Sequence, residues 1–233
     1  MNLPIREKID PPLEDLKPLL DDFSTGKFTT LIPEIRSLLL KFPNSAILYN
    51  LRGAIFATLE KFDLAVVDFK NSVRLDPNNT EALNNLGNAL AQKRDLKDSI
   101  VILKKSLSLE SKNFQTHQII GKAFHDSKEF EKAIEHYKIS IDLNPKEAST
   151  YLNLANSLYK VNKLDLALKN FTKVLTMQNH SAQAYLGIGL CHGKNHNFIE
   201  AVKSIKKAIE LNPSDYLSHY HMASILLKIE DSS

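Results

Sequence analysis

Hydrophobic residues recur along this chain at helical spacing. Leu83, Leu86 and Leu90, for example, are three or four residues apart. This spacing places them on one side of a helix, because an α-helix repeats every 3.6 residues. No segment shows the sustained alternation of a β-strand, and the chain contains no Asn-Gly or Asp-Gly hairpin sequence. The pattern predicts an all-α protein.

A longer period, equal to the distance from Pro43 to Pro77, is superimposed on the helical spacing. Pro145 and Pro213 follow at intervals of two such periods. We say that positions related by this period share a register. Three further registers each keep one residue type: small residues at Gly53, Gly87, Gly121, Ala155, Gly189 and Ala223; small residues at Ala65, Ser99, Ala133, Ala167 and Ala201; and large apolar residues at Phe28, Phe62, Leu96, Phe130, Leu164 and Phe198.

These residue types have physical reasons. Small side chains let two helices approach closely, and a larger one would overpack the contact at a cost of about 1–3 kcal/mol. Large apolar side chains fill the space between neighbouring pairs of helices. Proline cannot continue a helix, so it marks the turn to the next pair. Each period therefore predicts one helical hairpin.

The same residues carry a family resemblance. Tyr49, Gly53, Phe56, Phe62, Ala65, Phe69 and Pro77 stand at the spacing of the tetratricopeptide repeat signature. The chain resembles this family over about nine tenths of its length. The resemblance implies a right-handed α-solenoid, a superhelix of 34-residue antiparallel helical hairpins. In this family each hairpin buries its apolar face against its neighbours, and the first helix of each hairpin lines a concave groove.

The period divides the chain into segments. We expect an N-terminal tail at 1–11, a divergent capping repeat at 12–45, and a C-terminal helix with a short tail at 216–233. Five repeats lie between, at 46–79, 80–113, 114–147, 148–181 and 182–215. The capping repeat keeps Phe28 and Pro43 in register. Leu19 and Leu31 stand where the other repeats have small residues.

The C-terminal helix, 216–229, is apolar on more sides than one preceding hairpin can cover. One interpretation is an imperfect cap. The other is that a second copy of the chain or a downstream domain packs on it, because a leftover apolar face is typical of an interaction site.

Charge and composition exclude several classes. The net charge is +3 with both signs interspersed, which argues against nucleic-acid binding. We see no stretch of 18 apolar residues and no signal peptide, so we expect no membrane contact. Cys191 is the one cysteine and fits a reducing compartment. A cytoplasmic location is expected by elimination.

Candidate chemistry is sparse. Cys191, His192 and His196 lie close in sequence, but the glutamate of a zinc-protease motif is missing. His192 occupies a register that faces the hairpin core, and His196 falls in a turn. No nucleophile motif, phosphate-binding loop or dinucleotide fingerprint is present. We therefore expect no enzyme, no cofactor and no metal.

Arg52 is an exception in its register, which otherwise holds apolar residues such as Leu86 and Ile120. A half-buried charge should find a partner or extend to solvent. We expect an ion pair with an acidic residue of the capping repeat.

The groove is the candidate site. First-helix positions that the resemblance directs inward are Asn50, Asn84, Asn85, Asn88, Gln118, Lys122, His125, Asn153, Asn156 and Tyr159. Asparagine amides offer donors and an acceptor for a peptide backbone, although asparagine is also the common family residue at some of these positions. The family's carboxylate clamp is disfavoured, since Asn50, Gln115 and Ile119 occupy its basic positions.

The sequence thus predicts a protein–protein interaction scaffold that binds a peptide or a helix in its groove. An alternative is the substrate-recruiting repeat region of a larger transferase. The array is similar to repeat regions found ahead of some bacterial sulfotransferases and glycosyltransferases, whose catalytic part would lie outside these residues.

Overall fold

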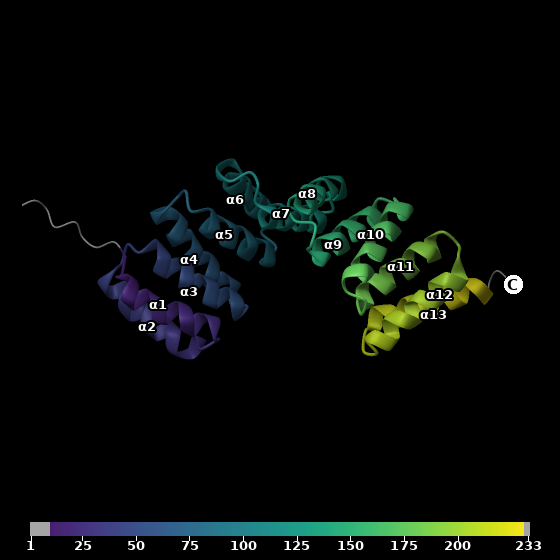
Figure 1. The fold of residues 1–233 in the computed structure, drawn as a ribbon, viewed down its shortest axis with the longest axis horizontal. Helices are drawn as coiled ribbons and strands as arrows, with labels where there is room; N and C mark the ends of the chain where they lie inside the picture. The colour runs from purple at the N-terminus through teal and green to yellow at the C-terminus, as the bar shows by residue number, and fades with distance from the viewer. Residues whose placement is uncertain (1–9, 231–233) are drawn as a thin grey trace, which may run out of the picture. The chain divides into compact units, whose positions relative to one another are not determined.

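A computed structural model describes residues 10–230, which fold into helices joined by short turns (Figure 1). The predicted tails fall largely outside the described residues, at 1–9 and 231–233. The helices are α1 (Leu13–Ser24), α2 (Phe28–Lys41), α3 (Ala46–Thr58), α4 (Phe62–Leu75), α5 (Thr80–Gln92), α6 (Leu96–Leu109), α7 (Phe114–Asp126), α8 (Phe130–Leu143), α9 (Ala148–Lys160), α10 (Leu164–Met177), α11 (Ala182–Lys194), α12 (Phe198–Leu211) and α13 (Tyr216–Glu230). Residues 10–230 contain no strand, so the predicted all-α class is confirmed.

The helices pack as consecutive pairs within two compact units. Unit 1 spans Met1–Lys112 and unit 2 spans Asn113–Ser233. Odd-numbered helices are the first helices of the pairs, and even-numbered helices are the second. Within each unit a first helix packs against its own second helix and against neighbouring pairs. The predicted array of helical hairpins is therefore present in both units.

The turn inside each hairpin has the same backbone geometry. Its last residue has a positive φ, between 57° and 75°, at Gly26, Glu60, Arg94, Lys128, Asn162 and His196. These residues share one register, and only the first is a glycine, the residue that adopts this conformation most readily. The hairpin of α1 and α2 therefore follows the period despite its divergent sequence.

Close helix packing explains the small-residue register. A Cβ atom added to the glycines would lie 2.8, 2.4, 2.7 and 2.5 Å from side-chain atoms of the second helix, for the pairs Gly53–Phe69, Gly87–Leu103, Gly121–Tyr137 and Gly189–Ile205. The partners have the same separation along the chain in every pair. The large side chain of the second helix therefore fills the space that the glycine leaves open.

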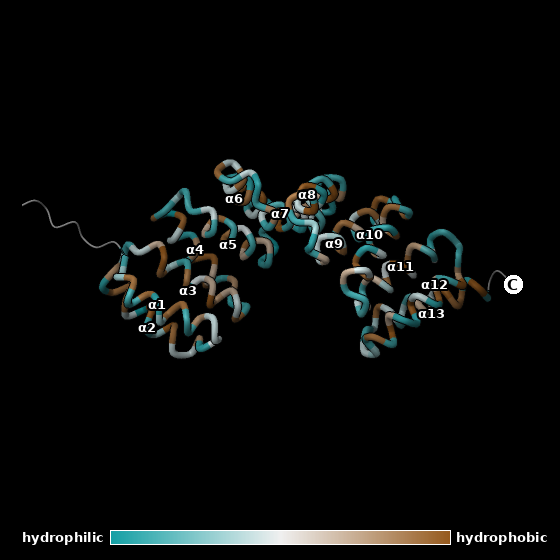
Figure 2. Tube along the Cα trace, in the orientation of Figure 1, coloured by the Kyte–Doolittle hydropathy of each residue, from teal (hydrophilic) through white to brown (hydrophobic). Residues whose placement is uncertain are grey.

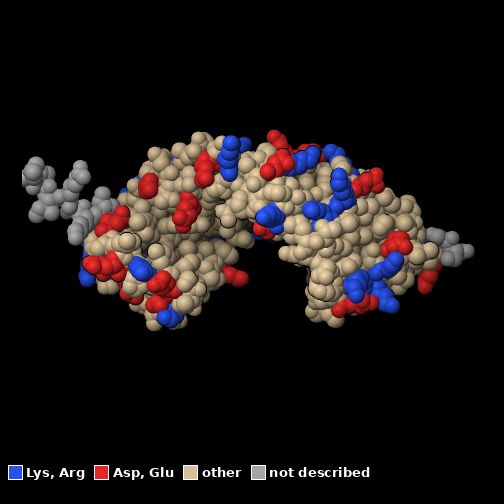
Figure 3. Space-filling model, in the orientation of Figure 1, with Lys and Arg blue, Asp and Glu red and all other residues tan. Residues whose placement is uncertain are grey.

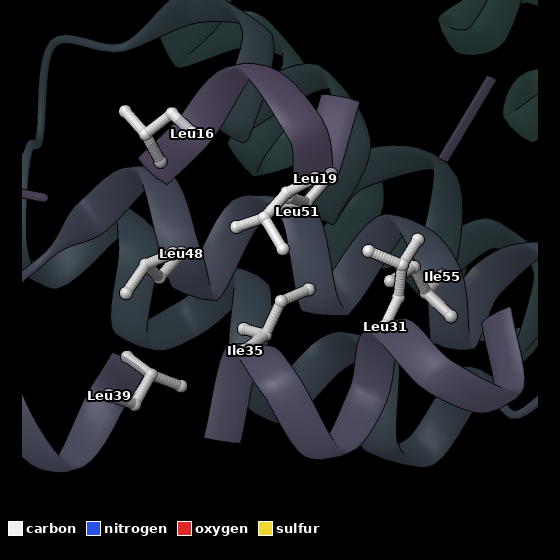
Figure 4. Packing of buried hydrophobic residues seen from close by; sticks show 8 residues of the cluster. All are labelled: Leu16, Leu19, Leu31, Ile35, Leu39, Leu48, Leu51 and Ile55. Atoms are coloured by element: carbon white, nitrogen blue, oxygen red, sulfur yellow. The ribbon is translucent and has the colours of Figure 1, made fainter. Parts of the chain in front are cut away.

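The capping repeat has a different core. Leu19 and Leu31, which replace small residues, are both fully buried. With Leu16, Ile35 and Leu39 they form an apolar cluster against α3 (Figure 4). Larger side chains thus fill the contacts between α1, α2 and α3.

The C-terminal helix α13 carries hydrophobic residues (Figure 2), and several of them are exposed. Leu226 is 45% exposed, whereas Leu90 and Leu158, in the same register, are 3% and 2% exposed. Tyr220 and Leu227 are also exposed. The leftover apolar face predicted from the sequence is therefore present. The idea that a second copy or a downstream domain covers it stays a prediction.

Arg52 pairs with a residue other than the one predicted. Its guanidinium donates two hydrogen bonds of 2.7 Å to the carboxylate of Asp68, on α4 of the same hairpin. The expected partner in the capping repeat is therefore wrong. The separation of Arg52 and Asp68 along the chain equals that of Gly53 and Phe69, so hairpin packing brings their side chains together.

Candidate functional site

Two amides and a carboxylate connect the first helices of unit 1. The Nδ2 of Asn85 donates to Oδ1 of Asn50 over 3.1 Å, and Nδ2 of Asn50 donates to Oε1 of Glu81 over 3.1 Å. Asn84 is half-buried and Asn88 is exposed. We call the surface formed by these residues the α3/α5 face. It has two amides held in place and one exposed amide beside them.

A cavity of about 480 Å³ opens on the α3/α5 face. Its apolar lining residues are Ala54, Ala57, Ala89, Phe62 and Phe69. Its polar lining comes from Thr58, Glu60, Asn85, Asn88 and Gln92. The cavity thus offers both apolar contacts and hydrogen-bonding groups to a ligand.

The hairpin of α7 and α8 has a side chain in the corresponding space. At the register of Ala57 this hairpin has His125, whose ring lies 5.2 Å from that of Phe130. Phe130 shares its register with Phe62, which lines the cavity of unit 1. His125 occupies the space beside Phe130 in unit 2. In unit 1 the smaller Ala57 leaves the corresponding space beside Phe62 open.

Unit 2 has a corresponding surface, which we call the α7/α9 face. Nε2 of Gln118 donates to Oγ of Ser149 over 2.7 Å and to Oγ1 of Thr150 over 3.0 Å. Nδ1 of His125 lies 2.8 Å from Oγ of Ser157. Burial lowers the pKa of His125, which favours the neutral ring.

Tyr159 lies beneath a lysine of the next first helix. The Nζ atom of Lys194 is 4.1 Å from the centre of the Tyr159 ring and 3.4 Å from its carbonyl oxygen. Burial raises the pKa of Tyr159. Asn153 is half-buried, while Lys122 and Asn156 are exposed. This face therefore presents amides together with cations.

Several polar residues of these faces were not predicted from the sequence, among them Glu81, Gln92 and Ser149. The spacing of residues along the chain could have identified some of them. Contacts between neighbouring first helices recur at separations of 31 and 35 residues, in the pairs Asn50–Glu81, Gln118–Ser149, Asn50–Asn85 and Tyr159–Lys194. Applying these separations to Asn50 would have identified Glu81.

Cys191 and His192 of α11 and His196 of the following turn differ in their exposure. Cys191 is fully buried, His192 is half-buried, and His196 is exposed in the turn with its positive φ. Residues 10–230 contain no group of three or more His, Cys, Asp or Glu side chains arranged to hold a metal. Within the same residues, no helix is long and apolar enough to cross a membrane. Acidic and basic side chains are mixed over the surface in view (Figure 3).

Family models match three parts of the chain. Models described as tetratricopeptide repeat match residues 55–107 and 182–215, and one described as TPR repeat matches 121–162. A crystal structure of MamA is 30% identical, with coverage of 69% of this chain and 94% of that chain and a TM-score of 0.64. The chain belongs to the tetratricopeptide repeat family. Membership supports a role as a protein-interaction scaffold.

Two further solved structures share the fold at 19% identity. One is PilF of Pseudomonas aeruginosa, with coverage of 91% of this chain and 96% of that chain and a TM-score of 0.78. The other is YrrB, described as a TPR protein with an unusual peptide-binding site, with coverage of 80% and 96% and a TM-score of 0.66. No curated protein sequence matches the chain significantly.

Proposed function

We propose that this tetratricopeptide protein is a scaffold that binds a peptide or a helix on its first helices, and that the α3/α5 cavity receives one side chain of the ligand. The observation that carries the proposal is the cavity of about 480 Å³ beside Asn85 and Asn88. Both residues belong to the groove positions predicted from the sequence. The peptide-binding site named for YrrB supports the same type of ligand.

The chemistry of the cavity suits a peptide. Asn88 is exposed, and its amide can donate to and accept from a peptide backbone. Asn85 is held by Asn50, which reduces the entropy lost on binding. The alanines and Phe62 provide apolar contacts for an inserted side chain. On unit 2, the proposal assigns to the ligand Gln118, Lys122, His125, Asn153, Asn156 and Tyr159.

The test begins with a random dodecapeptide phage library panned on the wild-type protein. Selected peptides are synthesised with a fluorophore, and their dissociation constants are measured by anisotropy. Ala57→His should fill the cavity with the side chain that helix α7 carries at this register. We expect it to weaken binding at least tenfold, and Asn88→Ala to weaken it severalfold.

Asn71→Ala is the matched control, because it also removes an asparagine amide from unit 1 but lies on the second helix α4, outside the cavity lining. A peptide held in the cavity should bind this variant with unchanged affinity. Circular dichroism melts check that each variant is folded. The cavity is excluded as the site if Ala57→His binds as tightly as the wild type. Failure to select any peptide would contradict the proposed function itself.

The transferase context remains an alternative within the same proposal. A substrate-recruiting region would use the same faces to hold a polypeptide substrate, so the binding test applies to both. The family models match repeats only, and none of them favours a transferase.

A further inference from the structure

One register in the last turn of the first helices changes from uncharged residues to lysines along the chain. It holds Thr58, Gln92, Asp126, Lys160, Lys194 and Lys228. The three lysines belong to α9, α11 and α13, all in unit 2. Neighbouring helices of this group pack side by side, so this end of unit 2 carries a row of cations. Unit 1 has uncharged residues at the same register.

Lys160 and Lys194 have no carboxylate within 4.0 Å among residues 10–230, and both are exposed. Other lysines of unit 2 do have such partners: Lys132 pairs with Glu129, Lys203 with Glu200 and Lys207 with Glu210. The two cations are therefore available to a ligand. Lys194 is also held against the ring of Tyr159.

Favourable interaction with the helix dipole is a simpler explanation for one lysine at the end of a helix. It does not explain the whole row, because α3 and α5 carry no basic residue in their last turns. Two histidines also experience the charge of Lys160. Lys160 helps to lower the pKa of His125 and of His221, after burial as the main cause.

The acidic groups near this row are few and already engaged. Asp215 accepts hydrogen bonds from the backbone amide and the hydroxyl of Ser218 at the start of α13. Asp126 has an interaction of its own. The surface around Lys160 and Lys194 is thus complementary to a negatively charged ligand.

We propose that Lys160 and Lys194 bind an extended acidic peptide segment whose carboxylates lie about three residues apart. Neighbouring packed helices have axes about 8–10 Å apart, and an extended chain in the polyproline II conformation has three residues per turn and rises about 3.1 Å per residue, so every third side chain points to the same side. Side chains three residues apart along such a peptide therefore match the distance between α9 and α11. Unit 2 as a whole is nearly balanced in charge, which favours a peptide over a nucleic acid.

This inference rests on the proposed function in that the ligand is a peptide, but it concerns unit 2, whereas the cavity lies in unit 1.

The probes are three fluorescent dodecapeptides, tested by anisotropy in 50 mM NaCl. The first has Glu at every third position, the second has the same Glu residues in one block, and the third has Gln in place of Glu. We expect the wild type to bind the first about tenfold more tightly than the third and severalfold more tightly than the second.

Lys160→Gln/Lys194→Gln should lose about tenfold in affinity for the first peptide. Lys203→Gln/Lys206→Gln, which removes the same charge from α12, should change it less than twofold. An equal loss in both double variants would overturn the inference, as would equal binding of the spaced and blocked peptides. Tighter binding of a 12-nucleotide oligothymidine than of the first peptide would assign the lysines to nucleic acid instead.

Ala57→His separates this inference from the proposed function. It should still bind the acidic peptide as the wild type does, because it alters unit 1 only. The inference would be overturned if Ala57→His lost binding of the acidic peptide while Lys160→Gln/Lys194→Gln kept it. The cavity would then be the site. The wild type could instead bind the acidic peptide while every phage-selected peptide binds Ala57→His as tightly as the wild type. That result would support the inference and exclude the cavity as a site.

Discussion

The glycines of the first helices show how single residues set the distance between helices. The four glycines at the register of Gly53 each face a large side chain of the second helix, and a Cβ atom on Gly121 would lie 2.7 Å from the ring of Tyr137. Tyr137 is almost fully buried, so its ring has little room to move. The residue type at this register therefore follows from the packing of the second helix.

We predict that Gly121→Leu lowers the free energy of unfolding by about 1–3 kcal/mol, because the added side chain overpacks the contact with Tyr137. Asn88→Ala, on an exposed first-helix position, should change it by less than about 0.5 kcal/mol. Urea denaturation followed by circular dichroism measures both. Equal effects of the two substitutions would mean that the two faces are wrongly assigned.

Within a hairpin, the pair of Arg52 and Asp68 replaces an apolar contact between the two helices. The Asp68 side chain is 3% exposed and that of Arg52 is 18% exposed. The double hydrogen bond to Asp68 raises the pKa of Arg52 and keeps its charge in place. In the next repeat the same two registers hold Leu86 and Ile102. The same hairpin geometry therefore accommodates either an ion pair or a pair of apolar side chains.

We predict that Arg52→Leu destabilises the protein by about 1–3 kcal/mol, because a buried carboxylate is left without its partner. The double variant Arg52→Leu/Asp68→Ile copies the residues of the next repeat and should recover most of that loss, as replacement of buried ion pairs by apolar residues often does. Thermal and urea unfolding of the single and double variants tests this. A double variant no more stable than Arg52→Leu would show that the ion pair is specifically required.

At the scale of the whole molecule, burial of titratable groups links stability to pH. Burial raises the pKa of Cys191 to about 11 from an ordinary value of 9.0, and it also raises the pKa of Tyr137. Both groups are neutral in the folded protein at pH 7. Their contribution to stability is fully present below their unfolded-state pKa values and is lost as the pH rises through the folded-state values.

We predict that stability falls between about pH 9 and 11, with Cys191 accounting for roughly 1–2 kcal/mol of the loss. Cys191→Ala should reduce the dependence, and alanine already occupies this register at Ala89 and Ala123. The measurement is urea unfolding at pH 7.5, 9 and 10.5. An unchanged alkaline loss in Cys191→Ala would contradict the role of the thiol, as would rapid labelling of Cys191 by a thiol reagent in the folded protein at pH 7.5.

The sequence by itself determined the period, the helix pairs and the all-α class. These follow from contacts that are local and repeated, such as the constant separation that joins Gly53 to Phe69 and the positive φ of each hairpin turn. These signals are strong because every hairpin packs its two helices in the same way. Each register therefore repeats the same type of residue several times along the chain. The same separation could have identified Asp68 as the partner of Arg52.

Only the tertiary structure decided which polar residues meet and where space remains. The cavity beside Ala57 is lined by residues of three helices, and in the hairpin of α7 and α8 the ring of His125 lies in the corresponding place. The available cations at Lys160 and Lys194 depend on where every nearby carboxylate lies. Such features arise from the volumes and charges of several helices together. A single register cannot encode them, because it specifies a residue type but not the neighbours around it.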